Sequence, residues 1–456
     1  MSGRTTSHLI LTLLAILWGG MILFNLEYLG SFTVHLLLVS VRWLQVLFIV
    51  LSVYGGTLLL FGALAKPRRA GPGHRPYISV LLPAKDEERV IEGTLRALAA
   101  QRYAVDGARH FELIVINDGS TDGTSEILER LAGPLGLRVV RTAPGSEGKA
   151  AALNLGTAAA SGEVLAVFDA DTRIAPDLLA QMAAALEEAG AGVAGVQGRR
   201  LPYNATTNIL TRMQDDEFAI LQTALLRGRE RARSFVSFAG NGLLVRREAL
   251  DDAGGWNEEA LTEDIDLSVR LYLRGWRIRY CDEALVWEEA VPSLAALIRQ
   301  RRRWFEGSLR SLGEHLPAIL LGRLPLRVRL DMLFYLGGAL AATLALLTNY
   351  AYALASLSGV IVLFLRLPTV IMAAAALFFS SALLAAGVVG RGWNPAGLVA
   401  VLLRSMVFAL PRLVIVPLAI AHYIQSALTG RMEWGKTTHV GDAAPEAAEA
   451  GYISRA

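Results

Sequence analysis

The sequence contains one cysteine, Cys281, in 456 residues, and it has almost no excess of charge of either sign. A single cysteine excludes an intrachain disulfide, which suits a polar domain in the reducing cytosol. The 44 Lys and Arg residues nearly balance the 41 Asp and Glu residues, and the net charge is +3. Bulk charge therefore gives no case for nucleic acid as a partner.

Hydrophobic residues, in contrast, are in excess and make up 53% of the chain, whereas soluble proteins usually contain about 45–50%. The excess is concentrated at the two ends of the sequence, and the middle has the composition of an ordinary soluble domain. This distribution predicts a soluble domain between two sets of membrane segments.

Two apolar runs near the N-terminus, residues 8–30 and 43–65, are each long enough to cross about 30 Å of hydrocarbon. A signal peptide is the competing interpretation of the first run, but no clear cleavage site follows it and a second run comes at once. Lys66 and Arg68 follow the second run, and flanking positive charge marks the cytosolic side. We expect a hairpin of two transmembrane helices over residues 1–69.

A further apolar block lies near the C-terminus, within residues 326–430, and arginines again precede it. Positive charge at this point places the domain of residues 70–325 in the cytosol. Arg404 and Arg412 interrupt the last apolar run, which favours an interfacial position for part of it. We expect three or four transmembrane or interfacial helices here, and a cytosolic, partly disordered tail over residues 431–456.

The central domain alternates short apolar runs with amphipathic segments, which predicts βαβ units and an α/β fold with a mostly parallel sheet. Nucleotides bind such sheets at the carboxyl ends of the strands. Strands are expected at residues 77–82, 112–116, 137–141 and 164–168, and helices at 86–100, 124–131, 149–159 and 175–189.

Two acidic motifs follow predicted strands. The segment Asn-Asp-Gly-Ser-Thr-Asp-Gly at residues 117–123 is either a simple turn or a place where Asp118 binds a nucleotide base. Asp169 and Asp171 flank Ala170 at the end of another strand. This pair is either an acidic turn or, as we favour, a site for a divalent cation that also binds a diphosphate.

The segment at residues 144–149 resembles a P-loop only superficially, because its glycine spacing is wrong and Ala150 replaces the required Ser or Thr. Lys149 nevertheless begins a predicted helix, and helix N-termini attract phosphate.

Two later segments each allow a structural and a functional interpretation. Thr262 either caps a helix whose first turn is acidic, the interpretation favoured by the segment alone, or introduces Asp264 as a general base. The run from Gln300 to Trp304 is either a basic interfacial helix or a place where arginine binds a diphosphate and tryptophan stacks on a sugar.

The order of these motifs resembles the membrane-integrated family 2 glycosyltransferases, among them hyaluronan, cellulose and poly-N-acetylglucosamine synthases and bacterial β-glucosyl-diacylglycerol synthases. The resemblance extends from about Tyr77 to Gly307. It implies a GT-A cytosolic domain, Mg²⁺ or Mn²⁺ as cofactor, a UDP-sugar donor, and a multi-pass protein of a bacterial-type inner (plasma) membrane with its catalytic domain in the cytosol.

The resemblance also implies a role for each motif. Asp264 corresponds to the catalytic base and Asp171 to the metal ligand. The remaining positions correspond to residues that bind the donor (Asp118, Lys149, Asp169, Gln300, Arg303) or the acceptor (Ala239, Gly240, Trp304).

The residues of the acceptor side resemble two kinds of enzyme. Gly240-Asn241-Gly242 with the later Trp256-Asn257-Glu258-Glu259 looks more like the glycolipid synthases. Residues 262–266 and Arg274-Gly275-Trp276 look more like the poly-N-acetylglucosamine synthases. We expect an inverting transferase that elongates a β-linked polysaccharide at the membrane. Synthesis of a glycolipid from diacylglycerol is the alternative, and a non-enzymatic membrane scaffold is a remote third.

Overall fold

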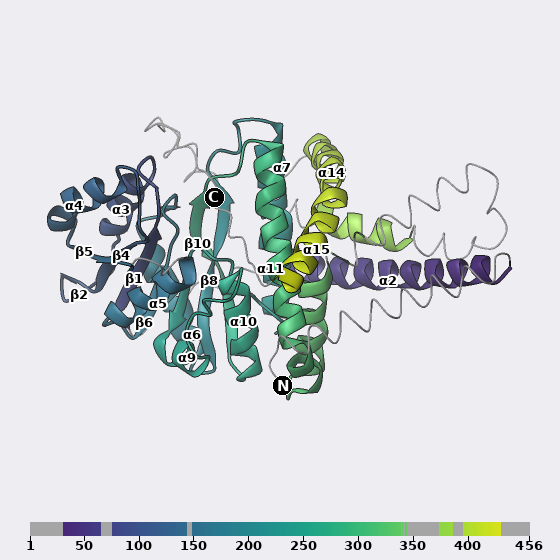
Figure 1. Ribbon diagram of the computed structural model, residues 1–456, viewed down its shortest axis with the longest axis horizontal. Helices are drawn as coiled ribbons and strands as arrows, with labels where there is room; N and C mark the ends of the chain where they lie inside the picture. Colours follow the sequence, from purple (N-terminus) through teal and green to yellow (C-terminus); the bar gives the residue numbers. More distant parts are fainter. Residues whose placement is uncertain are drawn as a thin grey trace.

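The structure is a computed structural model that describes residues 31–64, 75–143, 148–338, 340, 343, 374–385 and 395–429. A layered α/β domain lies at one end of the molecule, and helices from the two ends of the sequence pack at the other (Figure 1). The predicted apolar run at residues 8–30, much of the block after residue 343 and the tail from residue 430 lie outside the described residues.

The domain is built on an eight-stranded sheet with the order β5-β4-β1-β6-β9-β8-β10-β7. Six strands run in one direction and only β9 and β7 are antiparallel to their neighbours. The strands are β1 (Ile78–Ala84), β4 (Phe111–Asn117), β5 (Leu137–Arg141), β6 (Val164–Val167), β7 (Arg173–Ile174), β8 (Val193–Pro202), β9 (Leu243–Arg246) and β10 (Arg277–Glu288). A small separate hairpin pairs β2 (Ala104–Val105) with β3 (Ala108–Arg109).

Helices cover both faces of the sheet, because successive strand side chains alternate between two hydrophobic cores. Leu81 and Leu165 belong to one core, and Val80 and Ala166 to the other. The first core contains α5 (Lys149–Ala159), α9 (Arg247–Asp252) and α10 (Glu263–Leu273). The second contains α3 (Ile91–Ala99), α4 (Thr124–Leu135) and α6 (Leu178–Ala189).

The predicted α/β alternation is confirmed, with differences at the ends of elements. The strand at residues 137–141 and the helix at 149–159 begin and end as expected. The helix expected from residue 86 begins at Ile91, so the expected start is wrong. Asp86 has a φ of +52°, which an α-helix cannot contain, and its Oδ1 accepts a hydrogen bond from the Thr121 backbone N–H at 2.6 Å.

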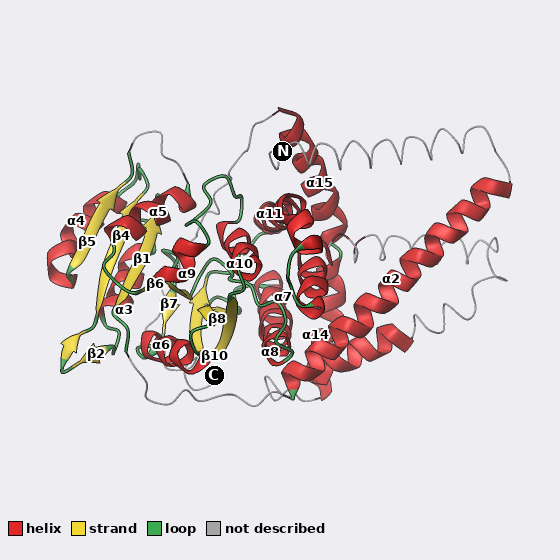
Figure 2. Cartoon of the chain, turned by 90° about the horizontal axis from the view of Figure 1, so that it is seen from below, coloured by secondary structure: helices red, strands yellow, loops and turns green. Residues whose placement is uncertain are grey.

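A second group of helices lies beside the domain (Figures 1 and 2). It contains α7 (Ile209–Glu217), a π-helical segment (Phe218–Ala224) and α8 (Leu225–Arg231), which follow one another directly. The long helix α11 (Leu294–Leu321) packs against α15 (Arg412–Thr429), and α14 (Pro395–Ala409) packs against α7. The 33-residue α2 (Ser31–Ala63) packs against α8 and is about 50 Å long.

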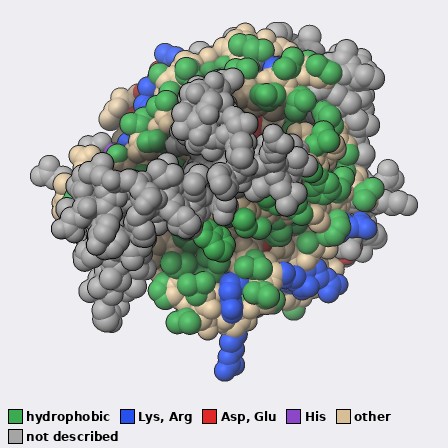
Figure 3. Space-filling view, turned by 90° about the vertical axis from the view of Figure 1, so that its right-hand side faces the viewer, with side chains coloured by type: hydrophobic (Ala, Val, Ile, Leu, Met, Phe, Trp, Pro, Cys, Tyr) green, Lys and Arg blue, Asp and Glu red, His purple; other side chains and the backbone are tan. Residues whose placement is uncertain are grey.

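Two described stretches, Val46–Ala63 and Val399–Thr429, are long and apolar enough to cross a membrane, judged by length and composition. Large hydrophobic side chains are exposed along both, and Figure 3 shows them spread over this face of the molecule. The second stretch is not one straight helix, because α14 ends before the turn at Leu410 and Pro411. In Figures 1 and 2, α15 runs across the direction of α2.

The arginines that interrupt this last stretch are paired with acidic residues of α7. Arg404 Nε lies 2.6 Å from Asp216 Oδ2, and Arg412 Nη2 lies 3.5 Å from Glu217 Oε1. Asp216 is 2% exposed, so its charge is largely removed from water and needs this partner. The pairs attach α14 and α15 to the end of α7.

A close contact between glycines sets the position of α2 against α8. A Cβ added to Gly62 would lie 1.9 Å from the Ala224 carbonyl oxygen, and one added to Gly228 would lie 1.9 Å from the Leu58 carbonyl oxygen. If α2 and α8 moved apart, Leu59 and Ala63 would lose their buried contacts with the π-helical segment. Glycine at both positions therefore allows the two backbones to touch.

We predict that Gly228→Ala lowers the melting temperature of the detergent-solubilised protein by several degrees, since overpacking costs about 1–3 kcal/mol. Gly93→Ala is the matched control, because a Cβ on this exposed glycine of α3 meets nothing within 4 Å. The control substitution is expected to be neutral or to stabilise by up to about 1 kcal/mol. Equal effects of the two substitutions in differential scanning fluorimetry would contradict the contact between α2 and α8.

Candidate active site

The parallel strands bring polar residues from distant parts of the sequence to one edge of the sheet. Lys85 follows β1, Asp118 follows β4 and Asp169 follows β6, each at the carboxyl end of its strand. Arg200 and Glu288 lie near the carboxyl ends of β8 and β10, which run in the same direction. This edge is the usual ligand site of an open α/β sheet.

Asp118 is buried at this edge, with 6% of its side chain exposed. Its Oδ1 accepts a hydrogen bond from Thr142 Oγ1 at 3.1 Å, and its Oδ2 accepts one from the Gly148 backbone N–H at 3.3 Å. Lys85 Nζ lies 3.9 Å from the same carboxylate. Asp118 therefore connects the end of β4 to the start of α5. Its position directly after a strand is the one that the sequence predicted.

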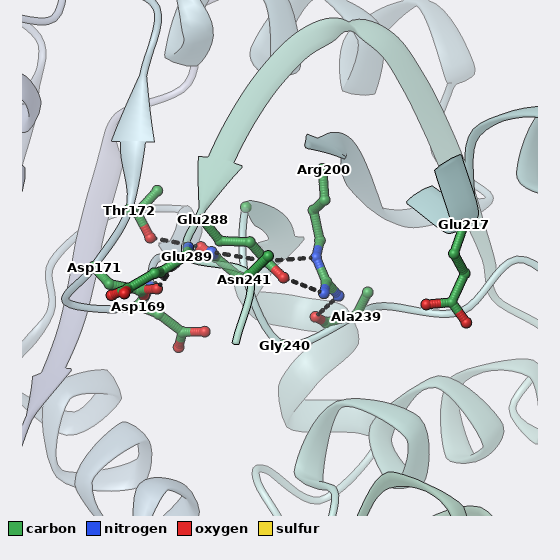
Figure 4. Close-up of polar contacts among 12 residues, drawn as sticks. Asp169, Asp171, Thr172, Arg200, Glu217, Ala239, Gly240, Asn241, Glu288 and Glu289 are labelled. Carbon is green, nitrogen blue, oxygen red and sulfur yellow. Dashed lines mark hydrogen bonds and ion pairs between the residues drawn. The ribbon is translucent and has the colours of Figure 1, made fainter. Parts of the chain in front are cut away.

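The pair Asp169 and Asp171 sits in the loop that follows β6 (Figure 4). The Asp171 side chain is buried, and its Oδ2 accepts a hydrogen bond from the Glu289 backbone N–H at 3.1 Å, whereas Asp169 is 37% exposed. Two hard carboxylates, one fixed and one open to the solvent side, fit Mg²⁺ or Mn²⁺ that completes its shell with phosphate oxygens.

Lys149, the first residue of α5, is surrounded by acceptors. Its Nζ lies 2.6 Å from Asp169 Oδ1 and 3.4 Å from Glu263 Oε1, and it donates to the Gly240 carbonyl oxygen at 2.8 Å. Burial lowers the pKa of this ammonium, but the carboxylates outweigh burial and keep the pKa above its ordinary value. Lys149 is therefore a permanent cation between the loop after β6 and the start of α10.

Asp264 is the second residue of α10 and lies close to this cation. Burial, and then the neighbouring Glu263 carboxylate, raise the pKa of Asp264 to about 7, while Lys149 acts in the opposite direction. Gly240, with a φ of +76°, approaches from the loop before β9, and a Cβ there would lie 3.4 Å from Asp264 Oδ2. A carboxylate of this pKa can accept a proton near neutral pH.

The capping interpretation of Thr262 is wrong for its side chain. Thr262 precedes α10 at the cap position but makes no side-chain capping hydrogen bond. Its hydroxyl instead packs against α11, where a Cβ on Gly307 would lie 2.3 Å from Thr262 Oγ1. The close approach of α10 to α11 therefore decides the position of Thr262.

The predicted run from Gln300 to Trp304 lies on α11, where residues three and four apart share a face. Gln300, Arg303 and Trp304 have this spacing, and all three side chains are partly buried. Burial lowers the pKa of Arg303, and the carboxylates of Glu263, Asp169 and Asp264 oppose the change. Arg303 thus interacts electrostatically with the same carboxylates as Lys149.

Arg301 on the same helix has a different environment. Its Nη2 lies 2.7 Å from Glu217 Oε2 at the end of α7, and its guanidinium lies 4.2 Å from the centre of the Trp304 ring. The basic run is therefore divided: Arg301 attaches α11 to α7, and Arg303 faces the acidic group.

Three residues connect the two sides of the site (Figure 4). The sequence did not identify Arg200 or Glu288, and Asn241 was noted only as part of the Gly240-Asn241-Gly242 motif. Arg200 forms a bidentate pair with Glu288, with Nε···Oε2 and Nη2···Oε1 distances of 2.9 and 2.8 Å. The Asn241 Oδ1 accepts hydrogen bonds from the Asp169 backbone N–H at 3.2 Å and from Thr172 Oγ1 at 2.9 Å. Only Glu288, an acid at the end of a strand, carried a signal like the one that identified Asp118.

Another acidic group, Asp266 with Glu314 and His315, has atoms close enough to hold an ion. Asp266 already accepts hydrogen bonds from Arg270 Nε at 2.7 Å and is paired with His315 Nε2 at 2.9 Å. Because a cation there would face the Arg270 guanidinium, we attribute this group to packing between α10 and α11.

Comparison with known proteins agrees with this geometry. The sequence model of the family described as glycosyltransferase like family 2 matches residues 74–307. A β-monoglucosyldiacylglycerol synthase from Trichormus variabilis is 35% identical over 67% of this chain, and the chain covers 64% of that relative's length, slightly under two thirds. A poly-β-1,6-N-acetyl-D-glucosamine synthase from Staphylococcus aureus is 32% identical over 50% of this chain and 54% of its own.

The fold is also found in a solved structure, that of a mannosyltransferase from Pyrobaculum calidifontis in complex with GDP-mannose and Mn²⁺. It has a TM-score of 0.54 and 23% identity, and the match covers 80% of this chain and 99% of the other. This likeness confirms the predicted GT-A fold. With the match of the family model over half of the sequence, it follows that this chain belongs to the glycosyltransferase like family 2.

Proposed function

We propose that the chain is an inverting glycosyltransferase that moves a sugar from a UDP-sugar to a membrane-associated acceptor. The observation that carries the proposal is the group of charges around Lys149. Three motifs far apart in the sequence supply Asp169, Asp264 and Arg303 to this one group. Family membership supports the reaction class, and UDP is inferred from the resemblance to UDP-sugar-dependent enzymes.

In the proposed reaction, Asp264 removes the proton of the acceptor hydroxyl while that oxygen attacks the anomeric carbon of the sugar. Single displacement from the opposite face inverts the anomeric configuration, and the nucleoside diphosphate leaves. Asp118 binds the base of the donor, and Gln300 and Arg303 hold the diphosphate. Lys149 keeps Asp169 and Glu263 compensated and limits the rise in the pKa of Asp264.

Asp171, with Asp169, would hold a divalent cation against the diphosphate, and such a cation offsets the negative charge of the leaving group. Besides Lys149, the chain supplies Arg303 as a cation near Asp169, and Arg303 lies on a helix that is held by contacts on both sides of its basic run. Arg301 pairs with Glu217 on one side, and Gly307 packs on Thr262 on the other. These contacts keep Arg303 oriented toward the acidic group.

We further propose a multi-pass protein of an inner membrane, with the catalytic domain of residues 70–325 in the cytosol. Residues 1–69 form the first pair of helices and residues 326–430 the second set, followed by the tail at 431–456. The exposed apolar side chains of α2 support a spanning helix. The paired arginines of α14 and α15, and the course of α15 across α2, support an interfacial position for these two helices.

Two acceptors fit the proposal. The Gln300-to-Trp304 run led us to expect a growing β-linked polysaccharide with Trp304 beneath the acceptor. The 35% identity to a β-monoglucosyldiacylglycerol synthase favours diacylglycerol as the second candidate. The Trp256–Glu259 likeness carries little weight between them. Asn154 Nδ2 donates to the Trp256 carbonyl at 2.9 Å and to Glu258 Oε1 at 2.8 Å, so this segment has a structural role.

A product partition tests the function directly. Purified protein in bacterial-lipid vesicles is incubated with Mg²⁺ or Mn²⁺ and a panel of radiolabelled UDP-sugars, with EDTA as the metal-free control. Label that extracts into chloroform–methanol identifies a glycolipid, and ethanol-insoluble label that a linkage-specific hydrolase destroys identifies a polysaccharide. We expect radiolabel to appear in one of these two fractions and to be absent from it when EDTA is present. Label in neither fraction with every donor contradicts the proposed function.

The role of Asp264 is tested by Asp264→Asn. We expect UDP binding by calorimetry to change less than twofold, and transfer to fall by about 10²–10⁴-fold, the usual contribution of a positioned base. Asp251→Asn is the control, since Asp251 is an exposed acid of α9 outside the site. Normal turnover in the Asp264 variant would remove this residue from the mechanism.

The raised pKa of Asp264 predicts an acidic limb in the pH profile of kcat/KM. The base works only when deprotonated, so activity falls as the pH drops through about 7. Glu263→Gln removes a charge that raises this pKa and is expected to move the limb to lower pH. Lys149→Met removes a charge that lowers the pKa and is expected to move the limb to higher pH. Shifts in the same direction would show that another group controls the profile.

A further inference from the structure

Arg200 is a buried charge next to the proposed acceptor side of the site. Its side chain is 7% exposed, and its guanidinium lies 5.2 Å from the centre of the Phe218 ring and 5.8 Å from that of Trp304. Besides the bidentate pair with Glu288, its Nη1 donates to the Ala239 carbonyl oxygen. A buried arginine with this many partners fixes the groups around it.

Glu288 extends these contacts to the donor side. Its Oε2 also accepts a hydrogen bond from Asn241 Nδ2 at 3.4 Å, and Asn241 Oδ1 in turn holds the loop of Asp169 and Thr172. The next residue, Glu289, donates its backbone N–H to Asp171. Hydrogen bonds thus connect Arg200 through Glu288 and Asn241 to the backbone of the loop that carries Asp169 (Figure 4). The Trp304 ring lies beside the other end of this chain of contacts, 5.8 Å from the Arg200 guanidinium.

We propose that the Arg200–Glu288 pair is a positioning device that sets the acceptor loop, Ala239 and Gly240, and the Trp304 ring at a fixed distance from the donor-side carboxylates. This inference rests on the proposed function, and it assigns to the pair the alignment of the acceptor with the donor. Neither residue needs to touch the reacting atoms. The predicted consequence is selective: loss of the pair weakens productive use of the acceptor and leaves donor binding intact.

The geometry requires arginine at this position. One planar guanidinium makes three kinds of contact at once: two hydrogen bonds to Glu288, one to the Ala239 carbonyl, and cation–π contacts with the Phe218 and Trp304 rings. A lysine ammonium is a compact point charge and has no planar group that could stack on an aromatic ring. It can therefore neutralise the Glu288 carboxylate but cannot orient the Phe218 and Trp304 rings. Arg200→Lys therefore separates the charge from the orientation.

The test compares Arg200→Lys and Glu288→Gln with a matched pair elsewhere. Arg246 is the last residue of β9, and its Nη2 lies 3.1 Å from Glu187 Oε1. Because β9 is antiparallel to β6, this pair lies at the opposite edge of the sheet from the candidate site. Arg246→Lys controls for the general loss of a partly buried guanidinium. Three quantities are measured for each variant. They are the rate at which water hydrolyses the donor, the affinity for Mn²⁺–UDP, and the rate of transfer into the product fraction that the wild-type protein labels.

We expect Arg200→Lys and Glu288→Gln to reduce transfer at least tenfold relative to hydrolysis, with Mn²⁺–UDP affinity within twofold of wild type. Arg246→Lys should leave the ratio of transfer to hydrolysis unchanged. A parallel loss of UDP affinity and transfer in the Arg200 variant, or an unchanged ratio, overturns the inference.

A second measurement does not depend on activity. Hydrogen exchange of the amides at residues 236–242 should become faster in Arg200→Lys, because the Ala239 carbonyl loses its fixed donor. Unchanged exchange there would also overturn the inference. If the wild-type protein transfers no sugar while exchange does respond, the proposed function fails but the positioning role of Arg200 stands.

Discussion

The candidate site depends on how a small number of cations compensate carboxylates that the sheet forces together. Parallel strands that end at one edge bring Asp118, Asp169 and Asp171 close to the start of α10, whatever the chemistry there. Such a concentration of negative charge is unstable without partners. Lys149 supplies the central one, because it reaches Asp169, Glu263 and the Gly240 carbonyl from a single helix start. The proposed nucleoside diphosphate would add to this negative charge, and the proposal therefore assigns Arg303 and a divalent cation to the same part of the site.

The apolar helices are part of the site's framework as well as candidates for membrane contact. Helix α11 carries Arg303 and Trp304 on its site-facing side, and its other contacts run to α7, through Arg301 and Glu217, and to α15. Glu306, one turn after Arg303, is 1% exposed and pairs with His422 of α15 at 2.8 Å. A shift of α15 against the domain would therefore move the helix that carries Arg303, the arginine proposed to bind the diphosphate. In the proposed membrane arrangement, the position of α15 in the lipid surface would therefore affect the geometry of the site.

Much of this arrangement followed from local sequence patterns, and the exceptions share a cause. The helix that starts at Lys149 and the strand ends that carry Asp118 and Asp169 were predictable, because periodicity and strand-end position are local properties. The start of α3 was wrong because Asp86 is held by Thr121, 35 residues away. Arg200 gave no signal, since its partner Glu288 lies 88 residues further along the chain. The roles given to the site residues stay predictions.

The missed residues also explain why the acceptor is harder to infer than the donor. The proposed donor recognition uses charges at strand ends, and those positions follow from the fold alone. The proposed acceptor side consists of a loop backbone, a tryptophan ring and a buried ion pair, and none of these features identifies a particular ligand. Ala239 and Gly240 present loop backbone beside Asp264, and Trp304 presents an aromatic ring, which suits a sugar ring as well as a glycerol backbone. The identity of the acceptor must therefore be decided by what the apolar helices deliver to this opening, and a lipid and a growing chain would arrive there by different routes.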